Sequence, residues 1–384
     1  MRFEFATASR IIFGPGTLEE VPALAAGFGR RALVVGGSTP ARTAWLVERL
    51  TELGIACASL RVSGEPTVAL AKEGAALARR AGSELVIALG GGSVLDSGKA
   101  IAALTTNPGE PEDYLEVVGR GLPLSGASLP CIAIPSTAGT GAEVTRNAVL
   151  GVPESRVKVS LRSPGMLPAV ALVDPRLTLS LPRPLTLTTG LDALTQLIEA
   201  FSSNKANPLT DSLCREGISR AGRSLRKACT DGGDIEARED LSLASLCSGL
   251  ALANARLGAV HGLAGPLGGM LGAPHGAICA RLLPFVLEAN LKAIGHGGVS
   301  SGLTARYAEI ARLLTGKSAA RAVDCIHWVK ELCAEFAVPA LAELGLREEE
   351  IPPAVAQARK SSSMQGNPVA LEETELRGIL EKAL

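Results

Sequence analysis

The stretch LVIALGGGSVLDSGK (residues 85–99) decides the fold of this chain of 384 residues. Its first five residues are all apolar, which is typical of a strand buried on both faces of a parallel sheet. Three glycines follow, and a helix is expected to begin near Ser93. Glycines let the backbone approach a phosphate closely, and a helix N-terminus offers that phosphate free N–H groups. The alternative is an ordinary glycine-rich turn with Ser93 as the helix N-cap.

Strand-like and helix-like segments alternate around this stretch. The other expected strands cover residues 32–35, 57–62, 131–134, 156–160 and 169–173, and the expected helices cover residues 41–53 and 68–81. Such alternation predicts a parallel sheet with helices on both faces. From about Pro184 the strand-like runs largely vanish, and Ala/Leu-rich helical segments continue to Leu384. We therefore predict an α/β domain at residues 1–180 and an all-α domain at residues 181–384.

Two further loops of small residues follow predicted strands. Gly36-Gly37-Ser38 follows the first strand, and PSTAGTGAE (residues 135–143) follows the strand at 131–134. Ligands of parallel sheets bind at the carboxyl ends of the strands, so these loops and the GGGS loop indicate a dinucleotide-binding domain. The glycines do not follow the GxGxxG spacing, which disfavours a standard Rossmann dehydrogenase. The other interpretation of residues 135–143 is a flexible loop of turn-forming residues.

Arg42 bears on the type of nucleotide. No acidic residue stands close to Gly36-Gly37-Ser38 to bind a free ribose 2′-OH, whereas Arg42 is near enough to meet a 2′-phosphate. This residue therefore favours NADP(H) over NAD(H) within an NAD(P)(H) site. The alternative is that Arg42 is a solvated helix residue.

Asp192, His261 and His275 form the second chemical signal. The sequence holds only four histidines, and these two lie in one glycine-rich stretch without a charged residue (257–280). A carboxylate and two imidazoles are a minimal ligand set for a catalytic divalent metal, Fe²⁺ or Zn²⁺. Gln196 shares the face of Asp192, which we expect to open a helix, because the two are four residues apart. The alternatives are a carboxylate at a helix N-terminus and two hydrogen-bonded core histidines.

Composition excludes several classes of protein. Lys and Arg (38) balance Asp and Glu (38), and aromatic residues make up 3%, so no nucleic-acid partner is expected. Eight cysteines without a CxxC pair are typical of free thiols in a cytoplasmic protein. The N-terminus lacks the apolar run of a signal peptide. Residues 257–280 are long enough to span a membrane, but their glycines and prolines favour buried helices that line a site.

Together these motifs resemble the iron-containing (group III) alcohol dehydrogenase family, whose wider superfamily includes glycerol dehydrogenase and dehydroquinate synthase. The resemblance runs nearly end to end, through residues 90–99, 135–143, 163–178, 190–201, 207–211, 257–269 and 274–276. It implies a dehydroquinate synthase-like fold, with NAD(P)H on the N-terminal domain and a metal in the helical one. It also implies a homo-oligomer, usually a dimer.

The resemblance assigns roles to particular residues. Those implied to contact the dinucleotide are Gly91, Gly92, Ser93, Asp96, Thr137 and Thr140, with Lys158 near the ribose. The four implied metal ligands are Asp192, Gln196, His261 and His275, of which Asp192, His261 and His275 form the catalytic centre.

Three positions depart from the family pattern. Members usually have His where Gln196 stands, often a second His where Gly265 stands, and Asn where Cys279 stands. With Gln196 as a weak fourth ligand, we expect a weakly bound metal and a preference for harder ions, or a site that has lost its metal. Gly265 removes a candidate proton relay and enlarges the pocket, which suggests a substrate unlike a simple primary alcohol.

The expected activity is metal-dependent hydride transfer between NAD(P)(H) and a small alcohol, aldehyde or ketone. Two alternatives stay open at this stage. One is a metal-independent NAD(P)H reductase of an oxo acid, similar to maleylacetate reductases. The other is a non-catalytic nucleotide-binding relic. A lyase of the dehydroquinate synthase type is disfavoured by the residue matches.

Overall fold

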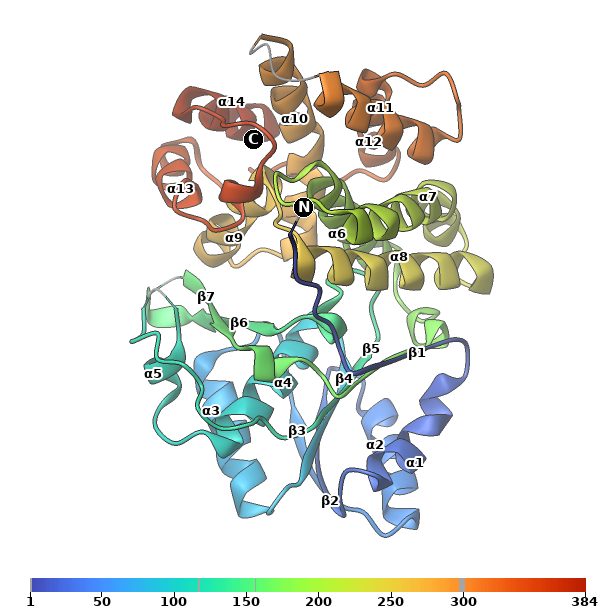
Figure 1. The fold of residues 1–384 in the computed structure, drawn as a ribbon, viewed down its shortest axis with the longest axis vertical. Coiled ribbons are helices and arrows are strands. Elements are labelled where there is room, and N and C mark those ends of the chain that lie inside the picture. The colour runs from blue at the N-terminus through green and yellow to red at the C-terminus, as the bar shows by residue number, and fades with distance from the viewer. Residues whose placement is uncertain (1, 117, 156, 297–300) are drawn as a thin grey trace. The chain divides into compact units, whose positions relative to one another are not determined.

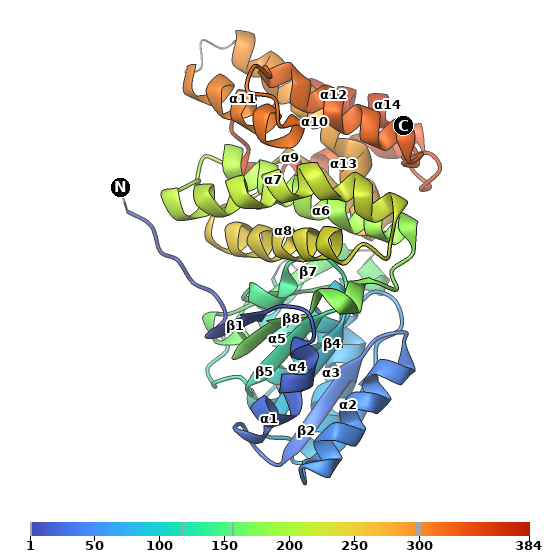
Figure 2. The same ribbon diagram turned by 90° about the vertical axis from the view of Figure 1, so that its right-hand side faces the viewer.

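The structure, a computed structural model, describes residues 2–116, 118–155, 157–296 and 301–384. It contains two compact units (Figures 1 and 2). An α/β unit comprises residues 6–137 and 141–178. A helical unit comprises residues 179–384. It also includes residues 138–140 and the N-terminal segment up to Phe5.

A six-stranded sheet forms the centre of the α/β unit. In spatial order its strands are β1 (Arg10–Phe13), β8 (Val170–Val173), β5 (Cys131–Pro135), β4 (Leu85–Gly90), β2 (Arg31–Gly36) and β3 (Ala56–Arg61). Every pair of neighbours is parallel, which confirms the predicted parallel sheet. The edge strand β1 was not predicted, because Ile11 is exposed and the strand is too short to show a buried apolar run.

Helices lie on both faces of the sheet (Figure 1), and alternate residues of the inner strands pack against opposite layers. Val34 and Ile87 pack on the face covered by α1 (Val21–Ala26) and α2 (Pro40–Glu52). Leu33 and Val86 pack on the other face, under α3 (Val68–Arg80) and α4 (Gly92–Thr106). Helices therefore cover both faces of the sheet, which is why the strands in its interior are apolar runs.

An antiparallel hairpin stands apart from this sheet. Its strands are β6 (Asn147–Val152) and β7 (Val157–Arg162). The strand expected at residues 156–160 therefore pairs in a separate two-stranded sheet, and residue 156 lies outside the described residues. A short helix, α5 (Pro111–Tyr114), lies earlier in the chain.

Lys99 ties α4 to this hairpin. Its side chain is buried, with Nζ 3.0 Å from the carboxylate of Asp96. The ammonium group also donates hydrogen bonds to Thr145 Oγ1, at 2.8 Å, and to the carbonyl of Asn147. Asp96 in turn accepts from the N–H of Val149 at 3.0 Å. A buried charge needs such partners, so this pair holds the helix that follows the glycine-rich loop in place.

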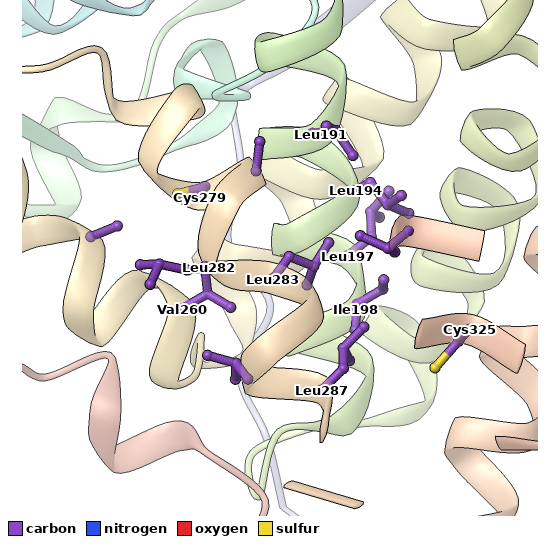
Figure 3. Close-up of a cluster of buried hydrophobic side chains, with 14 of the residues drawn as sticks. Leu191, Leu194, Leu197, Ile198, Val260, Cys279, Leu282, Leu283, Leu287 and Cys325 are labelled. Carbon is purple, nitrogen blue, oxygen red and sulfur yellow. The ribbon is translucent and has the colours of Figure 1, made fainter. Parts of the chain in front are cut away.

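The second unit is entirely helical, as predicted. Its helices are α6 (Arg183–Ser202), α7 (Pro208–Thr230), α8 (Ile235–Asn254), α9 (Ala259–Leu271), α10 (His275–His296), α11 (Ser301–Thr315), α12 (Ala322–Glu335), α13 (Ile351–Ala358) and α14 (Glu373–Ala383). Figure 3 shows Leu197 and Ile198 of α6 beside Leu283 and Leu287 of α10, in the core of this unit. The expectation that Asp192 opens a helix was wrong, because α6 begins at Arg183 and Asp192 lies in its middle.

Among the described helices, none is by itself long and apolar enough to cross a membrane. Helices α8 and α9 taken together have the necessary length and composition, but the chain bends by 96° between them. The charge-free residues 257–280 form α9 and the start of α10, and many of their side chains are buried in the core of the helical unit.

Candidate metal centre and dinucleotide loops

Three helices of the helical unit bring the predicted metal ligands together. Asp192 lies in the middle of α6, His261 in the first turn of α9, and His275 at the start of α10. Oδ1 of Asp192 is 3.5 Å from Nε2 of His261 and 3.8 Å from Nε2 of His275. Asp192 and His275, which are 83 residues apart in the sequence, therefore lie together with His261, as the sequence predicted. Both imidazoles present Nε2 to the carboxylate.

Cys279 is a fourth donor that sequence reasoning did not assign. Its Sγ lies 3.6 Å from Nε2 of His275 and 3.9 Å from Nε2 of His261. The ligand atoms of Asp192, His261, His275 and Cys279 all lie within 4.8 Å of one another. The available signal was the spacing of four residues between His275 and Cys279, which places two metal-binding side chains on one helix face.

The environment of Asp192 fits a bound cation. Its side chain is almost fully buried, and Oδ1 has no hydrogen-bond partner among the described residues. Burial alone would raise the pKa of Asp192, but the neighbouring imidazoles of His261 and His275 lower it. A buried carboxylate oxygen left without a hydrogen-bond donor is costly, and a divalent metal held with two imidazoles satisfies it.

Glu199 contacts His261 on the ring nitrogen that faces away from Asp192, and the sequence analysis did not identify it. Its Oε2 lies 2.6 Å from Nδ1 of His261, and its Oε1 accepts from the N–H of Val260 at 2.7 Å. Burial works against a charged imidazole, but Cys279 and Glu199 raise the pKa of His261 well above its ordinary value. With Nδ1–H donating to Glu199, the lone pair of Nε2 is left for a metal.

Gln196 is engaged by its neighbours. Its Oε1 accepts a hydrogen bond of 2.8 Å from Oγ of Ser248 on α8, while its Nε2 lies 3.5 Å from Oδ2 of Asp192. The amide therefore turns its NH₂ group, which is no metal ligand, towards the carboxylate.

One turn after His261, a Cβ added at Gly265 would meet no atom within 4 Å.

The α/β unit aligns the three loops expected to bind the dinucleotide. Gly36 is in register with Leu89, and Gly90 is in register with Pro135, so β2, β4 and β5 end side by side. In the sheet, β2 has β3 as its neighbour on one side and β4 as its neighbour on the other. The strand order thus reverses between β2 and β4, and such a switch point is where open α/β sheets bind ligands.

Gly91, and not Ser93, is the N-cap of α4, which begins at Gly92. Gly91 has no side chain to cap the helix, so the first N–H groups of α4 are not capped in this way. A Cβ on Gly91 would lie 3.4 Å from Cγ2 of Thr137, which shows that the two predicted loops face each other. An uncapped helix N-terminus beside small residues is suited to a phosphate.

For the other residues expected at the dinucleotide, the structure shows contacts with other parts of the protein. Asp96 is bound to Lys99 and to the backbone of β6, and Lys158 pairs with Glu65 at 3.2 Å. Thr140 belongs to the segment 138–140, which packs with the helical unit. Arg42 is not the solvated residue of the alternative reading, because its guanidinium donates to the carbonyl of Leu177 at 2.9 Å.

Comparison with known proteins agrees with this fold. Residues 8–175 match the model of the family described as iron-containing alcohol dehydrogenase, and residues 186–384 match the C-terminal model of the same family. The 1,3-propanediol dehydrogenase of Klebsiella pneumoniae is 36% identical over 343 residues, covering 87% of this chain and 85% of that protein. The matches together define an oxidoreductase of the alcohol dehydrogenase type.

Solved structures agree over the whole chain. A crystal structure of a 1,3-propanediol oxidoreductase superposes with a TM-score of 0.91 and 32% identity, covering 100% of both chains. The sulfoacetaldehyde reductase of Bifidobacterium kashiwanohense, solved in complex with NAD⁺, has a TM-score of 0.86 and 29% identity, covering 100% of this chain and 99% of that one. The chain belongs to the iron-containing alcohol dehydrogenase family, as its motifs indicated.

Proposed function

We propose that this protein is a metal-dependent NAD(P)(H) oxidoreductase that interconverts a small alcohol and the corresponding aldehyde or ketone. The observation that carries the proposal is the buried Oδ1 of Asp192, which has no donor among the described residues and faces Nε2 of two histidines. Family membership supports the reaction class, and the donor set supports the dependence on a metal.

Asp192, His261 and His275 would hold the metal. A divalent ion bound there supplies Lewis-acid polarisation of the substrate oxygen. Glu199 keeps the Nδ1 proton of His261 in place and so directs Nε2 into the site. The amide of Gln196 orients the carboxylate of Asp192 from the side opposite Oδ1. The apolar core around α6 and α10 keeps water away from Asp192 and His261, whose side chains are buried.

The loops at residues 36–38 and 91–93, together with Thr137, would hold the dinucleotide. Bound NAD(P)(H) supplies or accepts the hydride. The uncapped N-terminus of α4 supports binding of the diphosphate, and the NAD⁺ complex of the related sulfoacetaldehyde reductase supports the cofactor class. The preference for NADP(H) that Arg42 suggested stays a prediction, since one nitrogen of its guanidinium donates to the carbonyl of Leu177.

A small substrate is favoured by the names of two relatives, a 1,3-propanediol dehydrogenase and a sulfoacetaldehyde reductase. The missing side chain at Gly265 leaves space one turn from His261. We therefore propose short aldehydes that carry a second polar group, such as a hydroxyl or a sulfonate, as the first substrates to test.

The test is oxidation of NADH and of NADPH with a panel of short aldehydes, ketones and oxo acids. Each assay is run with added Fe²⁺, added Zn²⁺ or a chelator. We expect turnover of an aldehyde or ketone that the chelator abolishes. Reduction of an oxo acid that survives chelation would instead identify a metal-independent reductase, which the departure at Gln196 makes the second candidate. Dinucleotide binding without turnover would identify a relic.

A further inference from the structure

The fourth ligand of the proposed metal site is one of the three positions where the sequence departs from the pattern that the resemblance implies. The residue expected to supply it, Gln196, has its amide oxygen taken by Ser248 and its NH₂ group turned towards Asp192. For this oxygen to bind a metal, the amide would have to break the hydrogen bond from Ser248. Position 196 is therefore a poor source of a ligand in this arrangement.

We propose that the thiolate of Cys279 is the fourth protein ligand of the metal, in place of Gln196. The inference rests on the proposed metal site and goes beyond it by naming a sulfur donor. Cys279 is fully buried on α10, one helical turn after His275, so the two side chains leave the helix on the same face. Figure 3 shows Cys279 on α10 at one end of the apolar contact between α6 and α10.

Four of the six separations between donors are close to those around a tetrahedral ion. Ligands at bond lengths of about 2.0–2.3 Å lie about 3.3–3.8 Å from one another when they occupy the corners of a tetrahedron. The separations from Nε2 of His261 and of His275 to Asp192 Oδ1 and to Cys279 Sγ lie between 3.5 and 3.9 Å, and all four ligand atoms lie within 4.8 Å of one another. The four atoms thus surround a space of the size of one metal ion.

The partners of Cys279 also distinguish it from the other thiols of the helical unit. Its sulfur lies 3.9 and 3.6 Å from Nε2 of His261 and His275, and within 4.8 Å of a carboxylate oxygen of Asp192. By contrast, Cys325 and Cys333 donate to the backbone carbonyls of Ala322 and Ala280. A buried thiol among three metal-binding groups is placed to lose its proton to a metal.

A sulfur ligand changes the charge and the softness of the site. Asp192 and a thiolate together carry two negative charges, which neutralise a divalent ion, whereas a neutral amide would leave one positive charge. Thiolate also favours Zn²⁺ over hard ions such as Mg²⁺ and Mn²⁺. The preference for harder metals that Gln196 alone suggested is therefore reversed in this proposal.

X-ray absorption at the zinc edge of the Zn²⁺-loaded protein tests the assignment directly. The wild type is compared with Cys279→Ser and with the matched control Cys333→Ser, a thiol outside the site. We expect a sulfur shell at about 2.3 Å beside nitrogen and oxygen at about 2.0–2.1 Å in the wild type and the control. The sulfur shell should be missing from Cys279→Ser.

Competition with a chelator gives a second readout in the same proteins. Zn²⁺ affinity should fall in Cys279→Ser by more than the roughly 10–100-fold that loss of an outer-shell partner costs. It should fall less in Gln196→Ala. Bound zinc with nitrogen and oxygen neighbours alone in the wild type would overturn the role of Cys279 and leave the metal site standing. A wild type that binds no metal would overturn both proposals.

Discussion

Glu199 and His261 are joined by a contact of 2.6 Å between Oε2 and Nδ1, although 62 residues separate them in the sequence. The other oxygen of Glu199 accepts from the N–H of Val260. One carboxylate thus fixes both the first turn of α9 and the orientation of the imidazole that it carries. In metal sites such outer carboxylates hold the ligand tautomer and strengthen metal binding.

Replacing Glu199 with Gln should weaken the metal site without removing a ligand. A glutamine has one oxygen, so it cannot accept from both Val260 and His261. We expect metal affinity to fall about 10–100-fold, measured by competition with a chelator. Glu335→Gln, which removes a surface partner of Arg226, is the control. Equal affinities in the two variants would show that Glu199 has no positioning role.

Replacing His261 or His275 with Ala should abolish metal-dependent turnover, because each removes one of three proposed ligands. Bound metal, measured by elemental analysis, should be lost together with activity. His327→Ala is the matched control, since this histidine lies on the surface of α12 with its side chain 61% exposed. Unchanged turnover in either site variant would refute the assignment of ligands.

Gly98 should be required for the packing of α4 against the sheet. A Cβ at this position would lie 2.6 Å from Cβ of Ala88, which cannot move without moving β4. Gly98→Ala should therefore lower the free energy of unfolding by about 1–3 kcal/mol. Gly378→Ala, in α14, meets nothing within 4 Å and should raise that energy by about 0.5–1 kcal/mol. Denaturant unfolding measures both, and a stabilised Gly98→Ala would contradict the packing.

Glu143 should make stability depend on pH. Burial raises the pKa of its carboxyl from 4.5 to about 7, and its Oε2 has no hydrogen-bond partner among the described residues. The folded protein therefore favours the protonated form. This contribution to stability is complete below about pH 4.5 and is lost as the pH rises through 7.

Comparison with Glu143→Gln isolates this effect, because Gln keeps the size of the side chain and does not titrate. Each pH unit of pKa change corresponds to about 1.4 kcal/mol, so the wild type should lose about 3 kcal/mol relative to Glu143→Gln between pH 4 and 9. Denaturant unfolding at a series of pH values is the measurement. Parallel curves of unfolding free energy against pH for the two proteins would mean that the pKa of Glu143 is not raised.

The fold was largely predictable from the sequence because the strands in the interior of the sheet are buried on both faces. Runs such as residues 85–89 need no periodicity to be recognised. The strands β1 and β6 were missed, since neither is a continuous buried run. The start of α6 was missed although Pro184 stands in its first turn, a position where proline is common.

The candidate site was predicted in part. His261 and His275 were recognisable because histidine is rare in this chain, and Asp192 was recognisable from the family resemblance of residues 190–201. Glu199 and Cys279 gain their roles only from helices that meet in the folded unit, so their neighbours in sequence carried little signal. The dinucleotide contacts, the homodimer and the cytoplasmic location stay predictions.

The measurement that tests the central claim most directly follows turnover and bound metal together. The purified protein is stripped with a chelator and then titrated with Zn²⁺ or Fe²⁺, while NAD(P)H oxidation by a reactive aldehyde is recorded. We predict no turnover in the stripped protein and full recovery when one metal is bound per chain. Full turnover in the stripped protein would contradict the account.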